Sequence, residues 1–107
     1  MNIERVKKLE KFLKEDPDDP FIIYALAIEW INSDLMKSKT YFDELLSKHP
    51  SYVGTYYHAA RVYLALDNKS RAMEIYEGGI TIATKANNNH ALAELQTAYN
   101  QILYDED

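Results

Sequence analysis

The stretch VGTYYHAARVYLALDNKSRAMEIYEGGITIAT, residues 53–84, decides the fold because two helical patterns of apolar residues flank one short polar turn, Asp67-Asn68. Much of this pattern also occurs earlier in the chain. Ala72, Tyr76, Gly79, Ile80 and Thr84 repeat, after 34 residues, Ser38, Phe42, Leu45, Leu46 and Pro50. Tyr56, Ala59, Ala60 and Tyr63 repeat, after 35 residues, Phe21, Tyr24, Ala25 and Ile28.

A period of this size indicates stacked helical hairpins, each too small to bury its own apolar face. The sequence therefore predicts an all-α fold of about six helices, in antiparallel hairpins. The expected helices are Asn2–Lys14, Pro20 to about Asn32, a third that ends near His49, a fourth capped by Ser51 that runs to about Leu66, a fifth over about Lys69–Lys85, and a sixth with Leu92, Leu95, Tyr99, Ile102 and Leu103 on one face.

Several residues mark where the expected helices begin or where glycine interrupts them. Asn2 is placed to cap the first helix. Asp19 is placed to cap the second helix, of which Pro20 is the expected first residue. Gly78 and Gly79 each cost a helix about 1 kcal/mol relative to alanine. We expect Gly79 to be tolerated because a neighbouring helix crosses close to it, whereas the pattern offers no comparable reason for Gly78.

Composition narrows the class of function. The chain has 107 residues, 17 acidic and 12 basic, for a net charge of −5, so it lacks the positive field that attracts nucleic acid. It has no cysteine, which excludes disulfides and fits a reducing compartment. The longest apolar run, around residues 21–28, is too short for a membrane span. These features predict a soluble cytoplasmic protein.

Residues 53–84 resemble one tetratricopeptide repeat, because Tyr56, Ala59-Ala60 and Tyr63, followed by Ala72, Tyr76 and Gly79, match its alternation of large and small residues. Residues 18–51 are similar to a second, less regular copy. The resemblance implies a short right-handed superhelix and one domain over residues 1–107. Its expected parts are an N-terminal half-repeat (1–17), repeat 1 (18–51), repeat 2 (52–86), and a capping helix with an acidic tail (87–107).

In this family the outgoing helix of each hairpin lines a concave face that holds a partner. The resemblance therefore implies the following contact residues: Ile22, Leu26, Glu29, Trp30, Tyr57, Arg61, Leu64, Ala65, Ala93, Thr97, Asn100 and Gln101. Trp, Tyr and Arg are the types most enriched at binding hot spots. The alternative for Trp30 and Tyr57 is that both rings pack against neighbouring helices of the stack.

Some family members hold the acidic tail of heat-shock chaperones with a clamp of lysines, asparagines and an arginine. At the matching positions this chain has Ile22-Ile23 and Tyr57-His58, with Arg61 as the only cation. The clamp is therefore absent, and an apolar or amphipathic partner segment is the better expectation.

The sequence contains none of the motifs that indicate a catalytic site or a metal site. The sequence contains no phosphate-binding glycine loop, no serine elbow and no cysteine nucleophile. His49, His58 and His90 stand in different elements without the spacing of a metal site, and the acidic run at residues 15–19 lacks the spacing of a calcium loop. We therefore expect no enzyme activity, no cofactor and no metal.

The sequence thus predicts a non-enzymatic interaction module whose concave groove binds a protein or peptide, as a monomer or weak homo-oligomer, with neither nucleic acid nor membrane as partner. An alternative is a structural role, in which the terminal half-repeats of two chains complete each other as a homodimer.

Overall fold

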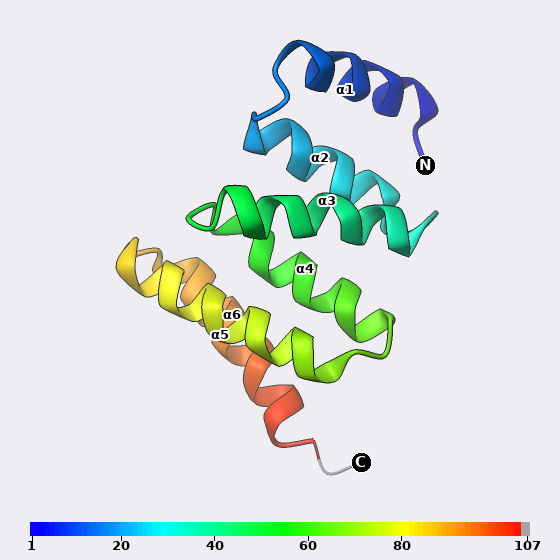
Figure 1. Cartoon of the computed structure of the whole chain (residues 1–107). Helices are drawn as coiled ribbons and strands as arrows, with labels where there is room; N and C mark the ends of the chain where they lie inside the picture. Colours follow the sequence, from blue (N-terminus) through cyan, green and yellow to red (C-terminus); the bar gives the residue numbers. More distant parts are fainter. Residues whose placement is uncertain (106–107) are drawn as a thin grey trace. The chain divides into compact units, whose positions relative to one another are not determined.

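The computed structural model describes residues 1–105, which form six α-helices and no β-strand (Figure 1). This confirms the predicted all-α class. The chain divides into two compact units, Met1–Tyr52 and Val53–Asp107, the second described as far as residue 105. The helices are α1 (Ile3–Glu15), α2 (Pro20–Trp30) and α3 (Leu35–Lys48) in the first unit, and α4 (Gly54–Ala65), α5 (Lys69–Lys85) and α6 (Asn89–Leu103) in the second.

Side-chain caps begin five of these helices. The predicted caps are confirmed: the side chain of Asn2 accepts a hydrogen bond of 3.0 Å from the backbone N–H of Arg5, and that of Asp19 accepts one of 2.9 Å from Phe21. The side chains of Asp34, Asn68 and Asn88 cap α3, α5 and α6 in the same way. Such caps satisfy amide groups that have no partner within the helix.

The fourth helix differs from the prediction, since Ser51 does not cap it. The helix begins at Gly54, and its N-cap, Val53, makes no side-chain hydrogen bond. Ser51 instead lies in a turn in which the Tyr52 N–H donates to the His49 carbonyl at 3.0 Å. Ser51 therefore stands two residues before Val53, the N-cap position from which a side chain caps a helix.

The turn between α4 and α5 forms at Asp67-Asn68, as the sequence predicted, and it contains no glycine. Asp67 adopts the left-handed conformation with φ of 60°, and the N–H of Asn68 donates to the Tyr63 carbonyl at 2.9 Å. Asn87, with φ of 55°, does the same between α5 and α6. Asp and Asn tolerate this conformation better than other non-glycine residues.

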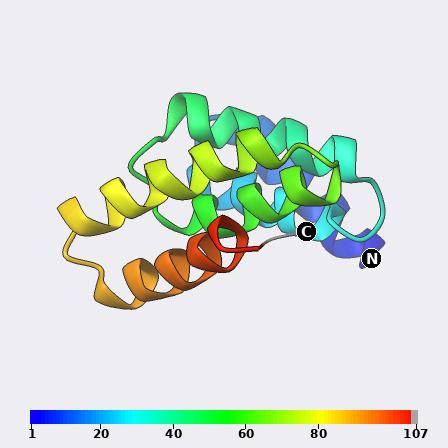
Figure 2. The ribbon, with the colours of Figure 1, turned by 90° about the horizontal axis from the view of Figure 1, so that it is seen from below.

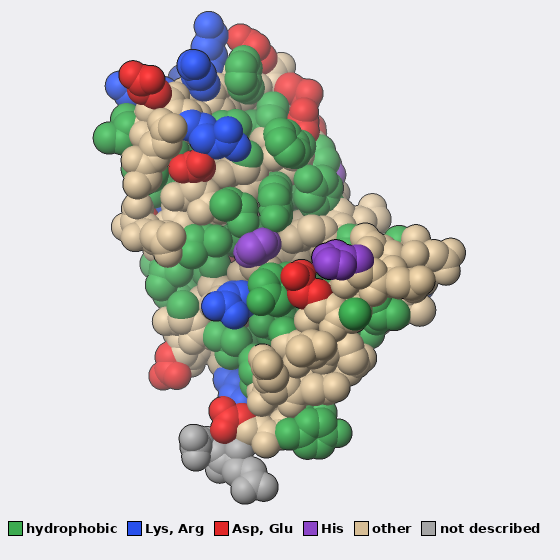
Figure 3. Space-filling view, turned by 180° about the vertical axis from the view of Figure 1, so that it is seen from behind, with side chains coloured by type: hydrophobic (Ala, Val, Ile, Leu, Met, Phe, Trp, Pro, Cys, Tyr) green, Lys and Arg blue, Asp and Glu red, His purple; other side chains and the backbone are tan. Residues whose placement is uncertain are grey.

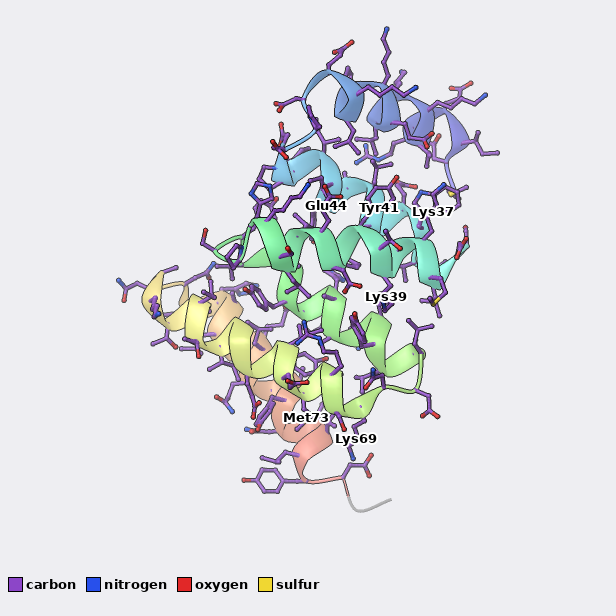
Figure 4. All side chains as sticks on the ribbon, in the orientation of Figure 1. Lys37, Lys39, Tyr41, Glu44, Lys69 and Met73 are labelled. Carbon is purple, nitrogen blue, oxygen red and sulfur yellow. The ribbon has the colours of Figure 1, made fainter. Side chains whose placement is uncertain are left out.

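In the first unit, α2 and α3 form a hairpin with a buried hydrogen bond between the two helices. The Ser38 hydroxyl on α3 donates to the Ala27 carbonyl on α2 at 2.6 Å. On another side of α2, Val6 and Leu9 of α1 join Leu26 in a buried cluster. Figure 4 shows Lys37, Tyr41 and Glu44 along the edge of α3 toward α1 and α2, with Lys39 on the opposite edge.

The first helix buries only some of its apolar side chains. Val6 and Leu9 are buried and Leu13 packs against their cluster, but Ile3 is 60% exposed and Phe12 is 48% exposed. The reason is geometric, because Ile3 and Phe12 flank the buried stripe of the helix on opposite sides.

In the second unit, α5 packs against both α4 and α6, and α6 also contacts α4 (Figure 2). Ala59, Ala60 and Ala72 have no exposed surface. Gly79 has the predicted close neighbour: a Cβ atom there would stand 2.6 Å from Cβ of Tyr56. Small residues thus let these helices approach closely, as the repeat pattern requires.

The packing revises the alignment of α2 with α4. Phe21, matched with Tyr56 by sequence, is 60% exposed, whereas Tyr56 is 6% exposed. Ile23, Leu26 and Ala27, each 0% exposed, occupy the environments of Tyr56, Ala59 and Ala60. The two outgoing helices therefore correspond at 33 residues rather than 35. The bond between Ser38 and Ala27 makes Ala27 the small residue of the crossing, two positions after the Ala25 that the sequence pattern selected.

Candidate functional site between α4 and α6

The candidate contact residues of α2 lie where α1 packs. Leu26 is fully buried in the cluster with Val6, and Ile22 and Trp30 pack against that cluster. Glu29 forms a salt bridge of 3.0 Å with Arg5 of α1. All four candidates of this helix are thus engaged within the first unit.

Trp30 has a particularly defined environment. The ammonium nitrogen of Lys37 lies 4.1 Å from the centroid of the indole ring, in the geometry of a cation–π interaction. The indole N–H is buried and has no hydrogen-bond acceptor among the described residues. These contacts correspond to the packing alternative weighed from the sequence.

The candidates of the second unit lie around one open groove of about 380 Å³. Tyr57 lines it from α4, and Thr97, Ala93 and Gln101 line it from α6, all four of them sequence candidates. The remaining lining residues are His90, Glu94 and Ala98. Tyr57 therefore faces small and polar side chains across the groove, which leaves room for a segment of another chain.

The other candidates surround the groove without lining it. Arg61 is exposed one turn after Tyr57, and its guanidinium carbon lies 5.7 Å from the tyrosine ring centroid. Leu64 is half-buried and Ala65 exposed at the end of α4. Asn100 is exposed on α6, and its side-chain oxygen accepts a hydrogen bond of 3.0 Å from Gln96.

His58, which contacts Tyr57, is the residue beside the groove whose pKa is shifted by its surroundings. Its ring meets that of Tyr57 edge-on, with centroids 5.4 Å apart. Burial lowers the pKa of His58 from its ordinary value of 6.5, and the positive charge of Arg61 lowers it as well, while the carboxylate of Glu94 opposes them. Figure 3 shows one face of the molecule on which histidines lie beside acidic and basic side chains, with hydrophobic side chains between them.

Sequence reasoning missed His90, Glu94 and Ala98 as groove residues. A signal was present, because His90, Glu94 and Gln101 recur at helical spacing on the same side of α6 as Thr97. Within residues 1–105, no group of three histidine, cysteine or acidic side chains is arranged to hold a metal ion.

The solved structures of other proteins identify the fold. A crystal structure of a tetratricopeptide repeat domain protein from Salinibacter ruber is 37% identical, with a TM-score of 0.77, over 80% of this chain and 98% of that one. A solution NMR structure of a tetratricopeptide repeat domain protein from the same organism is also 37% identical, with a TM-score of 0.78, over 86% and 95% of the two chains.

This chain belongs to the tetratricopeptide repeat family. No protein-family model matches the sequence, and no curated protein matches it at a significant level. The tetratricopeptide repeat fold is generally a scaffold for protein–protein interaction. Among the helices of residues 1–105, none combines the length and apolar character that a membrane span requires.

Proposed function

We propose that this tetratricopeptide repeat chain is a non-enzymatic interaction module that binds a segment of another protein in the groove between α4 and α6. One observation supports this above all: Tyr57 of α4 and Thr97 of α6, both of which the family resemblance selects as contact residues, line the same open groove. The ring of Tyr57 offers apolar area, while Thr97 and Gln101 offer hydrogen bonds. A preformed site on rigid helices loses little entropy on binding.

Charges of both signs lie next to Tyr57 and His58. Arg61 supplies a cation next to Tyr57, and Glu94 supplies an anion on α6. A partner segment that places an apolar side chain against Tyr57 and its backbone polar groups along α6 fits the ring and the polar side chains that line the groove. We include a cytoplasmic location in the proposal because the chain has no cysteine.

Site-specific photo-crosslinking tests the proposal. A benzophenone amino acid at Thr97, exposed in the groove, should capture the partner in cells, whereas the same amino acid at the exposed Lys69 of α5 (Figure 4) should not. For the partner so identified, Tyr57→Ala and Arg61→Ala should each weaken binding about fivefold or more, as expected for hot-spot residues. Lys39→Ala, on α3, is the control and should leave affinity unchanged. Equal crosslinking at both positions would place the site elsewhere.

Self-association is the second candidate, because apolar side chains remain exposed on the terminal helices. Ile3 of α1 is 60% exposed and Leu103 of α6 is 48% exposed. If these surfaces pair between copies, light scattering should show a dimer that Leu103→Ser converts to a monomer. A monomer at all concentrations would exclude this alternative.

A further inference from the structure

The first unit has an open pocket of about 340 Å³ to which α1 and α3 both contribute. Its lining residues are Glu10, Leu13 and Lys14 of α1, Pro17 of the turn after α1, and Tyr41 of α3. Figure 4 shows Tyr41 on the edge of α3 that faces α1 and α2. Because the outgoing helices line the concave face in this family, the pocket belongs to a different surface.

The walls of this pocket are mainly apolar and firmly held. Tyr41 and Leu13 are half-buried, and both pack against the buried cluster that contains Leu9. Pro17 is exposed, and its ring fixes the backbone angle φ at that position. A long side chain can therefore lay its methylene groups along Leu13 and Pro17 while its polar end reaches past them.

The electrostatic environment of Tyr41 is negative. Burial raises the pKa of its hydroxyl most, and the carboxylates of Glu10 and Glu44 raise it further, whereas no cation among the described residues lowers it. Glu44 forms a salt bridge of 3.2 Å with Lys48. Glu10 is half-buried and forms no salt bridge with any residue that the structure describes. An uncompensated carboxylate thus lines the same pocket as the aromatic ring.

Lys14 is the cation of the pocket itself. It is exposed and forms no salt bridge within the described part of the chain, although it stands four residues after Glu10 on the same helix. Another lysine near the pocket is engaged, since the ammonium of Lys37 lies 4.1 Å from the centroid of the Trp30 ring. Lys14 therefore opposes a cationic occupant, and its removal should favour one.

We infer that this pocket holds an arginine side chain of a partner protein, with its methylene groups along Leu13 and Pro17. The guanidinium stacks on the ring of Tyr41 and donates hydrogen bonds to the carboxylate of Glu10. Arginine fits better than lysine, because its planar group can stack on an aromatic face and also pair with a carboxylate through two hydrogen bonds. The inference goes beyond the groove between α4 and α6, since none of these residues lines that groove.

NMR titration of the isotope-labelled full chain tests the inference with blocked tripeptides. The arginine probe is acetyl-leucyl-arginyl-leucine amide, and it should shift the amide signals of Leu13 and Tyr41 in a saturable way. The same peptide with citrulline, which has the shape of arginine without its charge, should bind about threefold more weakly. The peptide with glutamate should bind more weakly still.

Two charge changes on α1 should have opposite effects on the arginine peptide. Glu10→Gln should weaken its binding about threefold or more, whereas Lys14→Gln should strengthen it, because a repulsive charge is removed. Lys11→Gln, exposed on the same helix but outside the pocket, is the matched control and should change affinity less. Tyr41→Leu removes the ring and should weaken binding, while Tyr57→Ala in the other groove should bind like the wild type.

Several results would overturn the inference. Equal binding of the arginine and citrulline peptides would show that the guanidinium charge is not recognised, and the absence of saturable shifts would exclude the pocket as a site. Tighter binding of the glutamate peptide, with loss of that binding in Lys14→Gln, would assign the pocket to an anion. Loss of arginine binding in Tyr57→Ala would place the peptide in the groove of the second unit. The unfolding midpoint shows whether each variant is folded, and Tyr41→Phe, which keeps the ring, should retain binding.

Discussion

At the scale of single residues, His58 is the side chain whose protonation is most informative. Burial of its ring has the largest effect on its pKa and disfavours the imidazolium, the carboxylate of Glu94 favours the imidazolium, and the charge of Arg61 disfavours it. The pKa of His58 in the folded chain is therefore below that in the unfolded chain. The unfolded chain binds the proton more tightly, so protonation favours unfolding.

This environment predicts the pH dependence of stability. The contribution of His58 should be fully present above about pH 6.5 and should be lost as the pH falls through that value toward the lowered pKa of the folded state. Urea unfolding at pH 7.5 and 5.5 should show a smaller loss of stability in His58→Gln than in the wild type. In NMR titrations, Glu94→Gln should lower the His58 pKa further, and Arg61→Ala should raise it. Opposite shifts would contradict the placement of these charges.

At the scale of elements, helix crossings decide which small residues are required. Gly78 and Gly79 are neighbours on α5, but only Gly79 lies at the contact with Tyr56 and Leu95. A Cβ at position 79 would stand 2.6 Å from Tyr56 Cβ and 3.1 Å from a methyl group of Leu95. A Cβ at position 78 would make an ordinary contact of 3.5 Å with the Tyr56 ring.

Alanine substitutions at these two glycines should therefore have opposite effects. Gly78→Ala should raise the free energy of unfolding by up to about 1 kcal/mol, because alanine favours the helix and meets no obstruction. Gly79→Ala should lower it by about 1 to 3 kcal/mol, because overpacking at an atom held by the backbone outweighs the gain in helix propensity. Urea denaturation measures both. A stabilising Gly79→Ala would show that α4 and α5 do not cross closely at this point.

At the scale of the whole molecule, the prediction of a single domain can be tested with the one tryptophan of the chain. Trp30 lies in the first unit, so its fluorescence reports unfolding there, whereas circular dichroism reports helices of both units. If residues 1–107 fold as one domain, the two transitions in urea should coincide. Leu9→Ala, which removes a buried side chain from the first unit, should then lower the free energy of unfolding by about 2 to 5 kcal/mol, and both probes should report the same loss. Transitions that separate would show that the units unfold independently.

The sequence by itself determined the helices and most of their ends. Caps such as Asn2 and Asp19, and the polar turn at Asp67-Asn68, act within a few residues of chain, so local composition is sufficient to predict them. The repeat in residues 53–84 was equally readable, because small and large residues alternate there with a clear helical period.

Only the tertiary structure decided which side of α2 is buried. Apolar residues occur all around this helix, and Ala25 and Ala27 are both small, so periodicity could not choose between them. The choice depends on contacts with α1 and α3, which bury Leu26 and Ala27 and leave Phe21 exposed. In the same way, His90 and Glu94 join Tyr57 in one groove only because α6 packs beside α4. Neighbours distant in sequence select the face of a helix that local patterns leave undetermined.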